Sequence, residues 1–105
     1  MDIPPLRKNL ATTLTSTQKL CLVQFRTEWS GSCQIMQPIY EELARYYKGS
    51  AQFFWVDADQ EKELYAQYGI KELPTILFFK NNELIDYAPG LVSKNKLIAK
   101  IENAL

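Results

Sequence analysis

Three short runs of apolar residues set the fold class of this chain. They lie at residues 20–25, 53–56 and 75–79. The first is too continuous for a strand that buries only one face, so it predicts a strand buried on both faces. Segments with helical spacing separate the runs. This alternation predicts an α/β domain in which parallel strands are joined by right-handed crossovers.

Apolar residues at helical spacing predict the intervening helices. Leucines at every fourth position favour a first helix with Pro5 in its first turn. Pro38 lies inside the second helix and should kink it. The predicted helices lie at residues 5–16, at 33–48, through 64–68 and at 97–105.

A β-hairpin completes the predicted sheet. Asn81 and Asn82 are residues typical of a tight turn, and residues 84–87 form the returning strand. The hairpin adds an antiparallel edge to the parallel strands. The 105 residues contain no repeat and no linker, which indicates one domain over residues 1–105.

Composition excludes several classes of function. Twelve Lys and Arg balance twelve Asp and Glu without a basic cluster, so we expect no nucleic-acid partner. No apolar run has the ~20 residues that span a bilayer, so no membrane partner is expected. The chain has no histidine, which removes Ser-His-Asp and Cys-His catalysis. We expect neither a metal nor a cofactor.

Two cysteines remain, Cys21 and Cys33. Six or seven strand residues at ~3.3 Å each place them roughly 20 Å apart, whereas a disulfide needs Cα atoms within about 7 Å. We therefore expect no disulfide. Cys21 is expected to be a buried strand residue, and for Cys33 a buried position in the first helical turn is favoured over a reactive thiol. Unpaired cysteines and a start without a signal segment predict a cytoplasmic protein.

The motif Trp-Ser-Gly-Ser-Cys at residues 29–33 resembles the Trp-Cys-Gly-Pro-Cys motif of the thioredoxin family. The resemblance runs from about residue 20 to residue 105. Its other anchors are Phe25, Pro38, Asp57, Asp59, residues 68–70, residues 73–75 and Gly90. It implies a thioredoxin fold, a mixed sheet of parallel strands plus a C-terminal antiparallel hairpin flanked by helices. It also implies a role in cell redox homeostasis.

The family's chemistry needs two thiols. The first lies at a helix N-terminus, where the helix dipole favours the thiolate that attacks a client disulfide, and the second resolves the mixed disulfide. Ser30 occupies the attacking position here, and Cys33 occupies the resolving position. The resemblance therefore implies that the dithiol cycle is lost. From the residues alone, Ser30 is expected to be a helix N-cap.

Four further positions depart from the family's pattern. Gln24 stands where family members usually carry a buried Asp that moves a proton, and an amide cannot act as a base. Arg26 replaces a common Trp, Trp55 aligns with a frequent Lys, and Ser32 replaces the proline between the cysteines. These departures indicate a naturally altered site.

The family's peptide-binding surface is the other feature carried over. Its proline is cis and presents the backbone of the preceding residue to an extended client. The matching residues are Trp29, Leu73, Pro74 and Gly90. They predict a module that binds a protein or an extended peptide.

Two alternatives remain open. One is an oxidoreductase that acts through the single thiol of Cys33, and the other is a structural subunit that associates through its sheet. Only residues 1–4 precede the first predicted helix, and Pro4 and Pro5 disfavour a full first strand. Residues 52–56 would then form an aromatic-rich edge, which predicts a monomer or a weak edge-strand homodimer.

Overall fold

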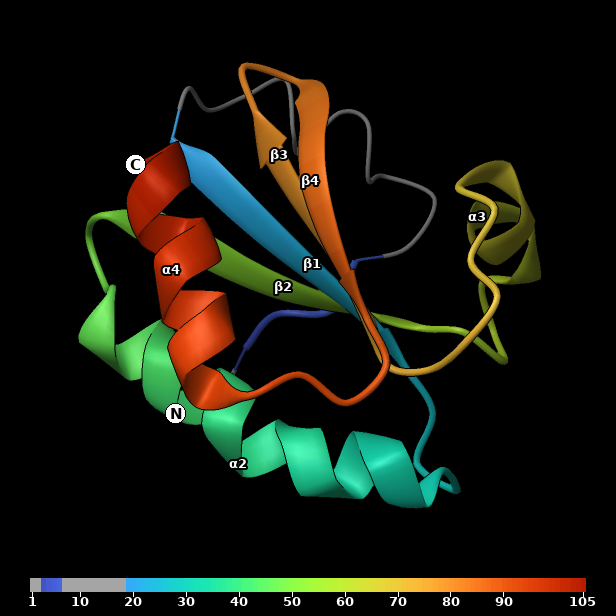
Figure 1. Ribbon diagram of the computed structural model, residues 1–105. Coiled ribbons are helices and arrows are strands. Elements are labelled where there is room, and N and C mark those ends of the chain that lie inside the picture. Colours follow the sequence, from blue (N-terminus) through green and yellow to red (C-terminus); the bar gives the residue numbers. More distant parts are fainter. Residues whose placement is uncertain (1–2, 7–18) are drawn as a thin grey trace.

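The computed structural model describes residues 3–6 and 19–105, and its strands and helices alternate along the chain (Figure 1). The elements are β1 (Leu20–Arg26), α2 (Gly31–Tyr46), β2 (Ala51–Asp57), α3 (Lys62–Gln67), β3 (Thr75–Lys80), β4 (Glu83–Pro89) and α4 (Lys94–Ala104). Each matches an element predicted from the sequence. The remaining prediction, a helix at residues 5–16, falls largely on residues 7–18, which lie outside the described residues.

The strands form a mixed sheet in the order β2-β1-β3-β4. β1 and β2 are parallel, whereas β1 pairs with β3, and β3 with β4, in antiparallel fashion. α2 and α4 pack on one face of this sheet, and α3 packs on the other (Figure 1). The expected thioredoxin fold is confirmed, but the run at residues 75–79 forms a strand antiparallel to β1, whereas the alternation of strands and helices predicted parallel strands.

β1 supplies the centre of the core. Leu20 and Leu22 belong to the apolar cluster under α2 and α4. Cys21, Val23 and Phe25 belong to the cluster on the α3 side. Successive side chains of a strand point to opposite faces, so a strand covered on both faces is apolar throughout. The prediction of a doubly buried strand at this position is confirmed.

The hairpin between β3 and β4 turns at two asparagines. Asn81 and Asn82 have φ angles of 54° and 64°. A two-residue hairpin turn needs positive φ at both positions, which Asn tolerates better than most residues. The turn chemistry expected from the sequence is therefore confirmed.

The prediction that Pro5 begins a helix is wrong. Pro5 forms a parallel bridge with Trp55 of β2. The amide of Leu6 donates to the Trp55 carbonyl at 2.7 Å, and the Trp55 amide donates to the carbonyl of Pro4 at 3.3 Å. Neither bond needs an N–H from proline. Part of the edge on which the predicted homodimer rested is thus occupied, and the homodimer itself stays a prediction.

Candidate functional site

Strand register gathers the predicted site at one end of the sheet. Phe25 pairs with Thr75, and Thr75 pairs with Pro89. Arg26 pairs with Asp57 at the same end. The segments that follow β1, β2 and β4 therefore meet the segment that precedes β3. This end of the sheet carries the loop with Trp29, the Leu73–Pro74 pair and Gly90.

Ser30 caps the helix that carries Cys33. Its backbone is extended, with φ −80° and ψ 125°, and its Oγ accepts the N–H of Cys33 at 3.4 Å. The Ser30 carbonyl accepts the N–H of Gln34 at 3.1 Å. An N-cap hydroxyl satisfies one of the free donors of the first helical turn. The N-cap prediction is confirmed.

Both thiols are unpaired and buried. Cys33 lies in the first turn of α2 and its side chain is 2% exposed. Cys21 lies in β1, where its thiol donates to the Lys19 carbonyl at 3.5 Å. Burial raises the pKa of the Cys21 thiol, which disfavours its thiolate. The expected absence of a disulfide between the two is confirmed.

Gln24 lies in the core beneath α2 and contacts Arg26. The Gln24 side chain is fully buried, and its Oε1 accepts from an Arg26 guanidinium N–H at 3.2 Å. Its Nε2 has no hydrogen-bond partner among the described residues. The guanidinium stacks over the Trp55 ring, 4.2 Å from the centroid. Burial lowers the pKa of Arg26, the carboxylates of Glu41 and Glu28 partly oppose this shift, and the guanidinium stays cationic.

Trp29 is held by a carboxylate from the end of β2. Its indole N–H donates to Asp59 Oδ2 at 2.7 Å, while the side chain remains 70% exposed. Asp57 Oδ1 accepts the amides of Asp59 and Gln60 at 2.9 and 3.3 Å, which fixes the turn that presents Asp59. The large apolar surface of Trp29 is therefore both oriented and accessible.

Pro74 and Gly90 are joined by the backbone. The Leu73–Pro74 peptide bond is cis, and the Gly90 amide donates to the Pro74 carbonyl at 2.7 Å. Pro74 is buried, whereas Leu73 and Gly90 are half-buried. Gly90 has φ +68°, and a Cβ there would collide with Glu72 Oε1. Glycine fits both constraints, the positive φ and the close approach of Glu72.

The sequence of the chain matches a known protein family. The thioredoxin family model matches residues 5–103. The chain belongs to the thioredoxin family. It is similar to the thioredoxin of Chlorobaculum thiosulfatiphilum, with 34% identity over 95 residues, 90% of this chain and 88% of that protein. It is 39% identical over 84 residues to the thioredoxin of Mycoplasmoides gallisepticum, 80% of this chain and 83% of that one.

The similarity extends to a plastid member. The chain is 40% identical over 81 residues to the chloroplastic M-type thioredoxin of Pisum sativum, which covers 77% of this chain and 47% of that protein. Taken together, the family model and these relatives make the protein a thioredoxin-like redox protein.

Three contacts of this thioredoxin-family domain were not foreseen from the sequence. Tyr40 was expected only on an apolar face, yet its hydroxyl lies 3.0 Å from the Leu22 carbonyl and 2.6 Å from that of Phe54. Burial raises the pKa of Tyr40 above its ordinary value. The sequence also did not predict the hydrogen bond from Trp29 to Asp59 or the approach of Glu72 to Gly90. Sequence offered no signal for them beyond the acidic residues themselves.

The described residues contain neither a cluster of metal-ligand side chains nor a membrane-spanning helix. Within residues 3–6 and 19–105, no group of three or more candidate ligand side chains gathers. No helix in the same ranges is long and apolar enough to cross a bilayer. The candidate site of this thioredoxin-family domain consists of the capped helix with its buried Cys33 and the exposed surface at the sheet end, whereas Cys21 lies at the opposite end of β1.

Proposed function

We propose that this thioredoxin-family protein binds an extended segment of a partner protein and does not run the two-thiol cycle. The observation that carries the proposal is the Ser30 hydroxyl, which caps α2 by accepting the N–H of Cys33. A hydroxyl at a helix N-terminus is not deprotonated near neutral pH and forms no disulfide. The chain has no histidine that would activate it.

The surroundings of the thiols support the same conclusion. Cys33 is buried, so a client disulfide has little access to its sulfur. The position that would hold a proton-moving carboxylate is filled by Gln24, whose amide oxygen is already bonded to Arg26. Position 24 therefore offers no titratable side chain that could exchange a proton with the thiol of Cys33.

The partner surface consists of Trp29, Leu73, Pro74 and Gly90, which we call the client surface. Trp29 contributes exposed apolar surface, and Leu73 contributes backbone hydrogen-bonding groups. Within the described chain, no hydrogen bond occupies the N–H or C=O of Leu73. A free backbone donor and acceptor beside an exposed aromatic ring suit an extended peptide. Buried Pro74 contributes shape to this surface.

A second candidate is oxidoreductase activity through the single thiol of Cys33, with glutathione or another external thiol. One observation favours it. Cys33 lies in the first turn of α2, where the helix dipole favours an anion. The burial of Cys33 argues against this second candidate.

As a cellular setting we propose a reducing compartment, the cytoplasm, in which both cysteines stay unpaired.

The proposal is tested by the reduction of insulin disulfides with dithiothreitol as the electron source. We expect the unmodified chain and a Cys33→Ala variant to match dithiothreitol alone, whereas a thioredoxin with both cysteines accelerates the reaction. A rate that is high and depends on Cys33 would support the single-thiol candidate. A rate equal to that of the two-cysteine thioredoxin would refute the proposed loss of the cycle.

A further inference from the structure

Four carboxylates lie at the end of the sheet that carries the client surface. We call Glu28, Asp57, Asp59 and Glu72 the acidic rim. Asp59 is bonded to the indole of Trp29, and Asp57 fixes the turn that presents Asp59. Glu28 precedes Trp29 in the chain, and the Glu72 carboxylate lies against Gly90. Asp59 and Glu72 therefore contact the client surface directly, whereas Glu28 adjoins Trp29 in the sequence and Asp57 acts through the turn.

No cation of the described chain forms an ion pair with the rim. The two ion pairs found within residues 3–6 and 19–105 join Lys94 to Glu42 and Lys100 to Asp86. The Arg26 guanidinium is turned to Gln24 and the ring of Trp55. The rim thus presents negative charge that no salt bridge of the described part neutralises.

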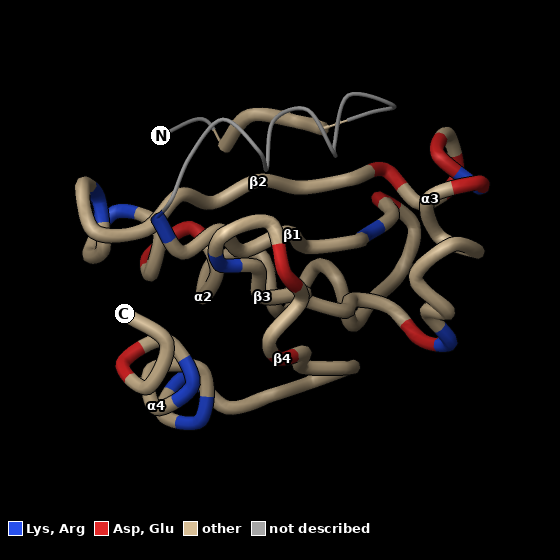
Figure 2. The backbone as a smooth tube through the Cα atoms, turned by 90° about the horizontal axis from the view of Figure 1, so that it is seen from above, with Lys and Arg blue, Asp and Glu red and all other residues tan. Residues whose placement is uncertain are grey.

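The charges of the described residues are unevenly distributed, although the formal net charge of the chain is zero. Figure 2 shows more red than blue segments around α3 and the adjacent end of β2, and more blue than red segments in α4 and at the opposite end of β2. An approaching cationic segment is therefore attracted to the end that carries the client surface.

A hollow beside Glu72 adds apolar surface to this charge. It has a volume of about 440 Å³. Leu77, Leu84 and Tyr87 line it together with the charged residues Lys71 and Glu72. Lysine and arginine combine an apolar stem with a cationic head. A wall of apolar side chains next to a carboxylate matches both parts.

We propose that the extended segment held by the client surface is basic, with a Lys or Arg whose head pairs with Glu72 and whose stem lies in this hollow. The inference rests on the proposed function, because it names the class of partner for the same surface. An acidic segment would face the unneutralised rim and be disfavoured.

The test uses a thiol placed at the client surface. A Ser30→Cys/Cys33→Ala variant reacts with three peptides that carry one cysteine as a mixed disulfide with 5-thio-2-nitrobenzoate. The peptides differ only in the two flanking residues, which are Lys, Gln or Glu. The variant's thiolate attacks the peptide sulfur, the new disulfide forms, and the nitrothiobenzoate anion leaves and is measured by its absorbance. Each rate is divided by that of N-acetylcysteine with the same peptide.

We expect the normalised rate of the Lys peptide to exceed that of the Glu peptide by about tenfold at low salt. Adding Glu72→Gln should reduce this ratio at least threefold, and 0.5 M salt should reduce it as well. Glu83→Gln is the matched control, because Glu83 begins β4 at the other end of the sheet, and it should leave the ratio unchanged.

The outcomes separate the two proposals. If all three peptides react no faster than with N-acetylcysteine, the client surface does not bind peptides and the proposed function fails. If all three gain equally, or the Glu peptide gains most, only the basic preference fails. The unmodified chain gives an independent check, since titration with the Lys peptide should shift the backbone NMR signals of Glu72 and Gly90.

Discussion

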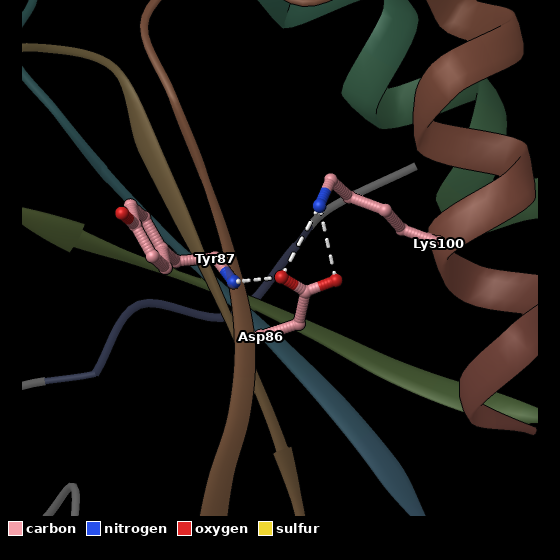
Figure 3. A network of polar contacts seen from close by, with 3 residues as sticks. All are labelled: Asp86, Tyr87 and Lys100. Carbon is pink, nitrogen blue, oxygen red and sulfur yellow. Dashed lines mark hydrogen bonds and ion pairs between the residues drawn. The ribbon is translucent and has the colours of Figure 1, made fainter.

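Lys100 of α4 forms an ion pair with Asp86 of β4 at 3.0 Å, and the same carboxylate accepts the backbone N–H of Tyr87 at 2.7 Å (Figure 3). β4 is the last strand of the sheet. A free N–H on such a strand invites pairing with another chain. Asp86 therefore ties α4 to the sheet and occupies a donor at its edge.

Replacing Asp86 by Ala should weaken the fold slightly and promote self-association. Both partners are partly exposed, so the ion pair contributes at most about 1 kcal/mol to the free energy of unfolding. Urea unfolding and sedimentation velocity measure the two effects. Lys100→Met is the control, since it removes the ion pair but keeps the carboxylate on Tyr87. Equal self-association of both variants would contradict the role of the carboxylate.

Gly90→Ala should destabilise the protein by about 1–2 kcal/mol, because its φ is positive, whereas the exposed Glu72 side chain that the new Cβ meets can move away. Gly31→Ala is the matched control. A Cβ at Gly31 has nothing within 4 Å, so its effect should stay within about 0.5 kcal/mol. The midpoints of denaturant unfolding of the parent and the variants measure these stability differences. If Gly90→Ala/Glu72→Ala is as unstable as Gly90→Ala, the backbone conformation alone sets the cost.

Stability should fall as the pH rises above about 10, the ordinary pKa of tyrosine. Burial, followed by the hydrogen bond to Glu102, raises the pKa of Tyr47 to about 12. The folded state therefore holds this proton more tightly than the unfolded state. The resulting stabilisation is complete below pH 10 and is lost as the pH rises through about 12.

Tyr47→Phe tests this pH dependence. The variant should lose less stability than the parent between pH 9 and 11, as measured by urea unfolding at each pH. Tyr87→Phe serves as a control, since Tyr87 is exposed. Identical pH profiles of the parent and Tyr47→Phe would show that this hydroxyl is not responsible.

Ser30→Cys should restore part of the redox chemistry. The new thiol lies at the start of α2, where the helix dipole favours its thiolate, and the family's spacing allows a disulfide with Cys33. Single-turnover reduction should remain about 100-fold below that of a two-cysteine thioredoxin, because Gln24 exchanges no proton. Adding Gln24→Asp should raise the rate.

Two results would count against this account of the site. Equal rates for Ser30→Cys and Ser30→Cys/Gln24→Asp would show that the missing carboxylate is irrelevant. An inert Ser30→Cys variant would mean that the helix terminus or the client surface has diverged as well.

Local patterns were enough to predict most of the fold. Apolar runs located the strands, and the N-cap of Ser30 follows from its residue type and position. The cluster of Gln24, Arg26 and Trp55 was beyond such reasoning. Its members were recognised only as separate departures, because the contact depends on the register that pairs Gln24 with Trp55. Register is a property of the assembled sheet.

The bridge between Pro5 and Trp55 has a consequence for the outer border of the sheet. In a parallel bridge the neighbours of Pro5 supply the bonds to β2, so the nitrogen of Pro5 faces away from the sheet. That nitrogen carries no hydrogen. At the other border, the hydrogen of the Tyr87 amide is already taken. A strand from another molecule that approaches either border therefore finds a hydrogen-bond acceptor at these two positions and no donor.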